Sequence, residues 1–189
     1  MLFIIKNKLD QLVRELLFHK YCSFSSLQDI QFNCKRGGII IKFEHLFTAY
    51  IEVGRPIEIG DVGIGYRRII PIIGGSFEGA RMRGKVLSGG ADYQLIRKDG
   101  VTELSAHYTI ETDNGVPIYV INRGYRHGSK EIVDKIFRGE DVPHDSYYFK
   151  TSPVFEVSNK NYDFLNRMMF IGEGVRKPTK VEVTFYQIL

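Results

Sequence analysis

A glutamate among apolar residues is the first candidate for chemistry in this sequence. Glu78 lies in phase with Ala80 and Met82, and side chains alternate between the two faces of a strand. A carboxylate that faces inward is costly unless it is hydrogen-bonded, paired or protonated. We therefore expect Glu78 to act as a general acid or base beside an aromatic cavity. The alternative is that nearby glycines make the strand end irregular and leave this carboxylate at a solvated rim.

Three tyrosines are expected on the same inward face as Glu78. Tyr93, Tyr108 and Tyr119 could line a pocket that stacks on a small aromatic ligand, with Tyr108 polarising a carbonyl during catalysis. The alternative is that each is a core tyrosine whose hydroxyl reaches backbone or water. His45 lies in phase with the phenylalanines on either side of it, so it is a further ligand-binding candidate, or a core histidine with its hydrogen bonds satisfied.

Asp92, His107 and Asn122 fall in one row across three expected strands. The row resembles the orienting half of a catalytic triad, but no serine or cysteine stands in a recognisable nucleophile setting. We interpret it as a polar row on the solvent face of the sheet. The histidines are isolated from one another along the chain, so we expect no metal site, and no cofactor motif is present.

Two turn dipeptides set the expected strand register. Asp99-Gly100 and Asn114-Gly115 are typical of two-residue hairpin loops, which would place Lys98 opposite Val101 and Asp113 opposite Val116. The residues then expected to be buried are Tyr93, Leu104, Tyr108 and Ile121, and those expected to be exposed are Arg83, Gln94, Ser105 and Glu111. If the two sets are interchanged, the loops are not two-residue turns and the pocket belongs to the row that contains Asp92.

These elements predict an all-β fold. The chain of 189 residues has 19 Gly, 11 Tyr and 13 Phe, a composition that suits short strands joined by tight turns. We expect one domain at residues 39–189, an antiparallel β-barrel or deep half-barrel. It carries one short helix at Ser129–Arg138, with Ser129 as the N-cap and Gly139 as the stop.

Residues 1–38 are predicted to form a helical extension followed by a linker. Apolar residues recur at helical spacing from Ile4 to Leu17, so this stripe must pack against the domain or a partner chain. The only two cysteines are Cys22 and Cys34, which favours a reducing, cytoplasmic setting with free thiols. Lysines interrupt the apolar start, so we expect neither a signal peptide nor a membrane span.

The charge pattern argues against nucleic acid as a partner. The chain has 26 basic and 22 acidic residues in mixed order, for a formal net charge of +4. The densest basic cluster is Arg81, Arg83 and Lys85, which on a strand would form a solvated stripe, and no nucleic-acid-binding motif accompanies it. A homo-oligomer is left open.

Six blocks give the chain a family resemblance over residues 42–189. They are Phe43-Glu-His-Leu-Phe-Thr, Arg68-Ile-Ile-Pro-Ile-Ile-Gly-Gly-Ser-Phe-Glu-Gly, Gly89-Gly-Ala-Asp-Tyr-Gln, Asn122-Arg-Gly-Tyr-Arg-His-Gly, Tyr148-Phe-Lys-Thr-Ser-Pro and Leu165-Asn-Arg-Met-Met-Phe-Ile-Gly. The chain resembles the family called domain of unknown function 3237. The resemblance implies a small β-barrel, and it places Glu78, Asp92 and Asn166 at motif positions. It thereby adds Asp92 and Asn166 to the ligand-binding candidates, although the register turns Asp92 outward.

Three functions remain open at this point. The first choice is a barrel that binds an apolar or aromatic metabolite without established chemistry. The second is an enzyme of the isomerase, cyclase or hydratase kind that uses Glu78 as its acid or base. The third is a structural or interaction protein that acts through its N-terminal helix. An inward cavity with titratable groups would favour the second, and a filled core the third.

Overall fold

The computed structural model describes residues 41–189, and the predicted helix from Ile4 to Leu17 lies outside them. Ten strands account for most of the described chain. They are β1 (Phe43–Val53), β2 (Ile57–Asp61), β3 (Gly65–Glu78), β4 (Arg83–Val86), β5 (Gly90–Arg97), β6 (Thr102–Thr112), β7 (Pro117–Gly128), β8 (Tyr147–Glu156), β9 (Phe170–Arg176) and β10 (Lys180–Ile188). One α-helix, α2 (Lys130–Phe137), and two 3₁₀ helices, η1 (His144–Ser146) and η2 (Lys160–Asn166), complete the elements.

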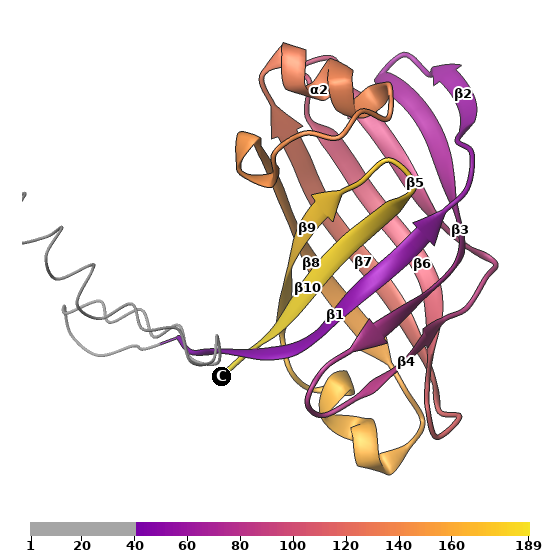
Figure 1. Ribbon diagram of the computed structural model, residues 1–189, viewed down its shortest axis with the longest axis vertical. Coiled ribbons are helices and arrows are strands. Elements are labelled where there is room, and N and C mark those ends of the chain that lie inside the picture. The colour runs from indigo at the N-terminus through magenta and orange to yellow at the C-terminus, as the bar shows by residue number, and fades with distance from the viewer. Residues whose placement is uncertain (1–40) are drawn as a thin grey trace, which may run out of the picture. The chain divides into compact units, whose positions relative to one another are not determined.

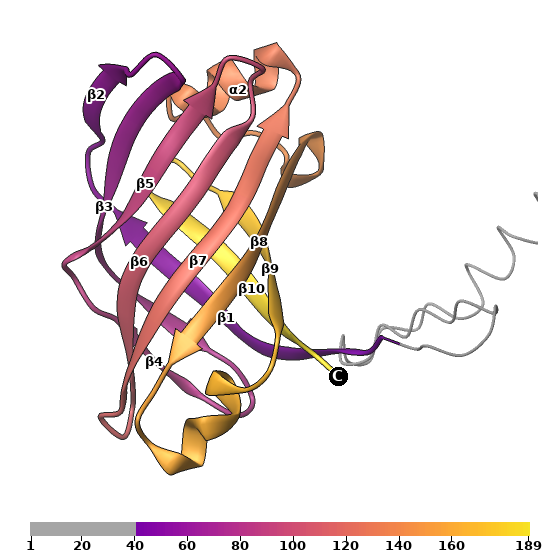
Figure 2. The same cartoon turned by 180° about the vertical axis from the view of Figure 1, so that it is seen from behind.

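The strands close into an antiparallel barrel. β1 pairs with β10 on one side and with β3 on the other, and the sheet runs β10, β9, β8, β7, β6 around the wall (Figure 1). β1 and β2 pair with different parts of one side of β3, and β4 and β5 pair with different parts of its other side. Seen from behind, β5, β6, β7 and β8 form one continuous wall (Figure 2). The prediction of an all-β antiparallel barrel is therefore confirmed, and the barrel is closed.

The two hairpin loops that were used to set the register are three residues long, so that prediction is wrong. Arg97 N donates to Val101 O over 2.8 Å and Thr112 N donates to Val116 O over 3.0 Å. Only the glycine that ends each loop needs the left-handed region, with φ of +86° at Gly100 and +77° at Gly115. Such loops combine a type I turn with one left-handed residue. Each shifts the pairing by one residue from the predicted register.

The shift leaves β6 as predicted and inverts the faces of β5 and β7. Leu104 and Tyr108 are buried, as expected, but Tyr108 lies opposite Val120 rather than Ile121. On β5, Gln94 is 5% exposed and Tyr93 is 44% exposed, the reverse of the prediction. Because the side-chain period of a strand is two, one residue of slip turns a whole strand over.

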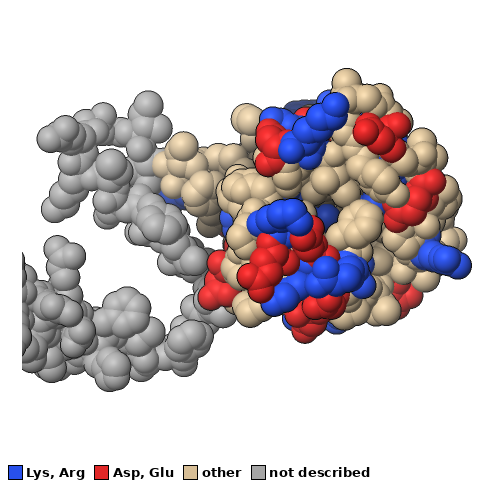
Figure 3. Space-filling model, turned by 90° about the horizontal axis from the view of Figure 1, so that it is seen from above, with Lys and Arg blue, Asp and Glu red and all other residues tan. Residues whose placement is uncertain are grey.

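The helix α2 covers part of one end of the barrel, which we call the helix end. Ser129 Oγ accepts from Ile132 N over 3.4 Å as the N-cap, and Gly139 follows the helix with φ of +80°. The predicted helix is confirmed. Ile136 is its buried residue and packs with Leu104 and Phe149 of the wall. Figure 3 looks onto this end, where basic and acidic side chains both surround the opening. None of the helices in residues 41–189 is long and apolar enough to cross a membrane.

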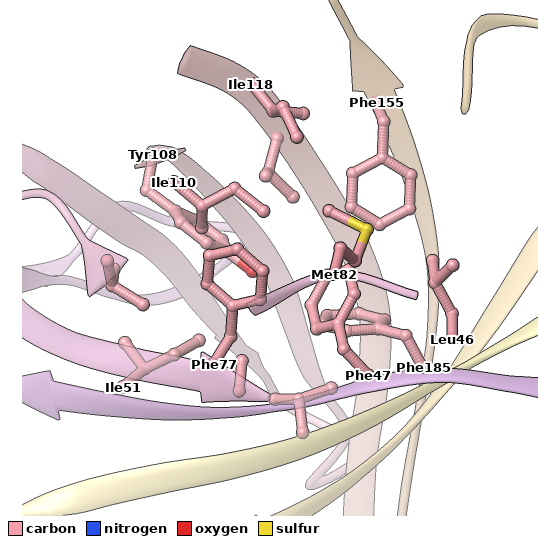
Figure 4. Close-up of a cluster of buried hydrophobic side chains, with 14 of the residues drawn as sticks. Leu46, Phe47, Ile51, Phe77, Met82, Tyr108, Ile110, Ile118, Phe155 and Phe185 are labelled. Carbon is pink, nitrogen blue, oxygen red and sulfur yellow. The ribbon is translucent and has the colours of Figure 1, made fainter. Parts of the chain in front are cut away.

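The opposite end of the barrel is filled by aromatic side chains, and we call it the phenylalanine end. Phe47 packs against Phe77 with ring centroids 5.0 Å apart and against Phe185 at 5.1 Å (Figure 4). Leu165 from η2 joins this cluster and is almost fully buried. Burying one such side chain contributes about 1.5–3 kcal/mol. The core therefore occupies this half of the barrel and leaves the other half for a cavity.

Candidate functional site

A cavity of about 340 Å³ lies inside the barrel towards the helix end. Its wall is partly apolar, with the rings of Phe137 and Phe149 and with aliphatic side chains from several strands, among them Ile51, Ile70, Ile72, Leu104 and Val183. Its buried and half-buried polar side chains come from six different strands and are Arg68, Asp92, Gln94, Tyr108, Asn122, Arg126, Thr151 and Arg176. Three exposed polar residues also line it, namely Arg55, Arg138 and Thr179. We call this space the barrel cavity. A mixed wall of this kind is typical of a site for a small organic molecule.

A chain of hydrogen bonds links three of the polar side chains. Arg68 Nε donates to Gln94 Oε1 over 2.9 Å, and Gln94 Nε2 donates to Asp92 Oδ2 over 2.7 Å. The other oxygen, Asp92 Oδ1, accepts from Ser105 N over 2.9 Å. The two carboxylate oxygens of Asp92 thus each have a donor. Burial nevertheless raises the pKa of Asp92. The two hydrogen bonds, and then the positive charges of Arg126 and Arg68, oppose that rise only in part.

Arg126 brings a buried positive charge into the barrel cavity. It is 5% exposed, and within residues 41–189 its guanidinium has no hydrogen bond or ion pair. Its Cζ lies over the ring of Phe149, 5.8 Å from the ring centroid. Burial, and then the positive charge of Arg68, lower the pKa of Arg126 to about 10, so it stays protonated at neutral pH. Arg176 adds a third positive charge, which also lowers the pKa of Arg126.

Three buried polar atoms at the cavity have no hydrogen-bond partner in the described residues. They are Tyr108 Oη, Asn122 Oδ1 and Thr151 Oγ1. Ala106 pairs with Asn122, so Tyr108 and Asn122 are diagonal neighbours on β6 and β7. Burial, and then the charge of Asp92, raise the pKa of Tyr108, so its phenol stays a hydrogen-bond donor.

Glycines on both sides give Thr151 its place in the wall. Thr151 pairs with Gly124 of β7 and with Gly172 of β9. A Cβ at Gly172 would lie 2.3 Å from Thr151 Oγ1, and one at Gly124 would lie 2.6 Å from its Cγ2. Neither position can hold a larger residue without displacing Thr151.

Glu78 does not face the barrel cavity, so the prediction that it does is wrong. It is exposed on the outer wall, where it pairs with Thr48 of β1 and with Arg83 of β4. It shares a shallow outer depression with His45, whose Nε2 lies 3.2 Å from Thr48 Oγ1. The physical reason is alternation: Phe77 points into the core, so Glu78 must point out.

Tyr93 and Tyr119 also lie on the outer wall, apart from Tyr108. His107 joins them there, with Nδ1 2.9 Å from Tyr119 Oη and its ring centroid 6.0 Å from that of Tyr93. Asn166 lies on η2 at the phenylalanine end, where its side chain pairs with the backbone of Val157 at 3.0 and 2.8 Å. Of the predicted site residues, the structure brings only Asp92 and Tyr108 together at the cavity.

Sequence reasoning missed most of the polar wall. The missed residues are Arg68, Gln94, Asn122, Arg126, Thr151 and Arg176. Two of them, Gln94 and Asn122, were assigned to the solvent face through the misjudged loops. A three-residue reading of the loops that end at Gly100 and Gly115 would have turned them inward. No cluster of three or more metal-binding side chains occurs in residues 41–189, and the absence of a metal or cofactor stays a prediction.

Fold and cavity define a class: a closed antiparallel β-barrel that is packed at one end and holds a polar cavity at the other. The chain belongs to the family described as Protein of unknown function (DUF3237), whose model matches residues 41–188. The family resemblance drawn from the sequence is thus confirmed.

Individual relatives agree with this membership. A UPF0311 protein of Rhodopseudomonas palustris (strain TIE-1) is 40% identical over 149 residues, which are 79% of this chain and 97% of the relative. The crystal structure of a conserved protein of unknown function from Rhodopseudomonas palustris has a TM-score of 0.76 at 39% identity, over 79% of this chain and 98% of that one. A beta-barrel like protein from Acinetobacter baumannii AYE has a TM-score of 0.70 at 36% identity, over 84% and 100%.

Proposed function

We propose that the protein binds a small apolar or aromatic metabolite inside the barrel cavity. The observation that carries the proposal is the set of three buried, unpartnered polar atoms of Tyr108, Asn122 and Thr151 on the cavity wall. Leaving such an atom without a partner costs about 1–3 kcal/mol. A ligand hydroxyl at this point could accept from Tyr108 Oη and donate to Asn122 Oδ1, and so supply missing hydrogen bonds.

The size and the other walls of the cavity support the same proposal. Its volume of about 340 Å³ lies in the range of small-molecule sites. The aliphatic side chains of Ile51, Ile70 and Ile72 would contact the body of an apolar or aromatic compound. Burial of apolar surface would supply the affinity, and the polar atoms would set the orientation.

A neutral fluorescent probe tests the proposal directly. N-phenyl-1-naphthylamine should bind saturably with one site per chain and emit more strongly when bound. The variants Ala106→Leu and Ala106→Trp, which add bulk at the cavity wall, should weaken binding at least ten-fold. Val154→Trp introduces a tryptophan on the outer wall of β8, where Val154 is exposed, and should bind as the unchanged protein does. Equal binding by all variants would place the probe outside the barrel and contradict the proposal.

Proton transfer is a second candidate function, with Asp92 in the role first given to Glu78. The observation that favours it is a carboxyl of raised pKa in the same cavity as the Tyr108 phenol. Such a pair could supply the general acid and base of an isomerase, cyclase or hydratase that acts on a phenolic or keto compound. Incubation with keto compounds in D₂O should then give deuterium uptake by mass spectrometry, which Asp92→Asn abolishes. Equal uptake by the variant would remove this candidate.

The third function, interaction through the N-terminal helix, concerns residues outside those described and stays a prediction.

A further inference from the structure

We infer that the ligand of the barrel cavity is an organic carboxylate whose anionic group is held by Arg126 at the helix end of the cavity. This inference rests on the proposed function and names the chemical class that the site would select. It follows from the charges inside the barrel, the contacts of each guanidinium and the spacing of the polar groups.

The charge inside the cavity is not balanced by the protein. Five arginines line it, of which Arg55 and Arg138 are exposed while Arg68, Arg126 and Arg176 are buried or half-buried. The one carboxylate in the wall is that of Asp92. Each of the two Asp92 oxygens already accepts a hydrogen bond, from Gln94 and from the Ser105 backbone. No hydrogen bond or ion pair joins Asp92 to Arg126 in residues 41–189. A buried cation without a partner is strongly unfavourable, and an anionic ligand would remove that penalty.

Arg126 is the guanidinium best placed to contact the ligand. Arg176 donates from Nη1 to Lys180 O and from Nη2 to Pro178 O, each over 3.2 Å, so both ends of its fork are held by the backbone. Arg68 uses Nε for Gln94 and lies over the Phe137 ring at 4.7 Å. Of these three, only Arg126 has no hydrogen bond in residues 41–189, and its Cζ lies 5.8 Å from the Phe149 ring centroid. It can therefore bind both oxygens of a carboxylate, while the other two arginines add to the positive field.

Spacing along β7 gives the length of the ligand. Arg126 and Asn122 point to the same face of this strand, four residues apart, which separates their Cα atoms by about 13 Å. A carboxylate at Arg126 and a hydroxyl group near Asn122 and Tyr108 would thus stand at opposite ends of one molecule. Leu104 and Ala106 line the wall between them. This arrangement fits a hydroxylated aromatic acid of about two fused rings.

Calorimetric titration with a matched pair of compounds tests the inference. We would use 6-hydroxy-2-naphthoate and its neutral isostere 6-hydroxy-2-naphthamide at pH 7, which differ only in the charged group. The acid should bind at least ten-fold more tightly than the amide. Arg126→Gln should abolish this preference. Arg123→Gln changes the same residue type on the same strand but on the exposed outer wall, and should keep it.

The unfolding temperature of the unliganded variants separates binding from a structural role. Arg126→Gln should leave this temperature unchanged or raise it, because it removes a buried charge without a partner. A lower unfolding temperature with the preference for the acid intact would make Arg126 a structural residue and overturn the inference.

The remaining outcomes separate the inference from the proposed function. Equal affinity for acid and amide, with binding still lost in the Ala106 variants, would overturn the carboxylate inference and leave the barrel as a site for neutral compounds. Absence of binding by either compound, together with naphthylamine binding that Ala106→Leu does not weaken, would overturn both.

Discussion

Gln94 donates to Asp92 Oδ2 over 2.7 Å, and this bond couples two inward-facing side chains of the same strand. Because Gln94 also accepts from Arg68, its amide orients both the Arg68 guanidinium and the Asp92 carboxyl group. The amide group can do this since it carries both a donor and an acceptor. The polar wall is therefore a connected network on the side of β3 and β5, whereas the side formed by β6, β7 and β8 holds the unpartnered atoms.

Gln94→Leu should destabilise the fold, because it removes an acceptor from Arg68 and a donor from Asp92 inside the barrel. We expect a loss of about 1–3 kcal/mol in the free energy of unfolding, measured by urea denaturation. Lys98→Leu, an exposed change in the loop that follows the same strand, is the control and should change this free energy by less than about 0.5 kcal/mol. Equal stability of both variants would contradict the network's role.

Asp92 should make the stability of the fold depend on pH. Burial raises its folded-state pKa above the ordinary value of 3.8. Below pH 3.8 the carboxyl is protonated in both states, so its favourable contribution is fully present. As pH rises through the folded-state pKa, the unfolded chain ionises more readily and that contribution is lost. The charged and titratable groups that act on Asp92 from other strands are Arg68 of β3, Tyr108 of β6 and Arg126 of β7.

The measurement is the free energy of unfolding between pH 3 and pH 7 for the unchanged protein and for Asp92→Asn. The difference between the two should grow in favour of the variant as pH rises. Other carboxyls cancel in this difference, because both proteins contain them. Asp113→Asn, an exposed change, serves as the control and should run parallel to the unchanged protein. A difference that stays constant with pH would mean that burial does not perturb Asp92.

The sequence predicted the barrel and the faces of β6 but not the polar side of the cavity. On β6 the residues Leu104, Ala106, Tyr108 and Ile110 alternate with polar ones, so the pattern alone identifies the inner face. On β7 both Tyr119 and Val120 are apolar, and only the loop length could decide between the two faces. That length was read as two residues instead of three.

On β5 the prediction of the inner face was wrong for a second reason. Its inner face carries Asp92 and Gln94, and its outer face carries Tyr93. The hydrophobic pattern of this strand therefore predicts the wrong face as the buried one. Patterning assumes that buried residues are apolar, and the assumption breaks where a cavity needs polar groups. The misassigned residues are therefore those of the candidate site.

Gly115→Ala tests the loop geometry that sets this register. No atom lies within 4 Å of an added Cβ there, so the only penalty is the left-handed backbone at φ of +77°. We expect a loss of about 1–2 kcal/mol in the free energy of unfolding. Gly115→Asn should lose less, since asparagine tolerates this conformation. Equal stability of the glycine and alanine forms would indicate a different loop conformation.

Changes at the two ends of the barrel should have opposite effects on stability and binding. Phe77→Ala opens a void in the phenylalanine end, where the side chain is 1% exposed, and should lower the free energy of unfolding by about 3–5 kcal/mol. Tyr108→Phe removes a buried hydroxyl that has no partner, so it should leave stability unchanged or raise it.

Affinity for 6-hydroxy-2-naphthoate should fall in the Tyr108 variant and not in the Phe77 variant. Tyr108→Phe takes away the phenol that would donate to the ligand's oxygen, and we expect affinity to fall about five- to ten-fold, which is the effect of one hydrogen bond of roughly 1–1.5 kcal/mol. Phe77→Ala does not touch the cavity wall and should bind within about two-fold of the unchanged protein at a temperature where it is folded. Tyr119→Phe removes a hydroxyl of the same kind on the outer wall, so it should change neither property by much. If the Tyr108 and Tyr119 variants lose affinity equally, the ligand does not enter the barrel.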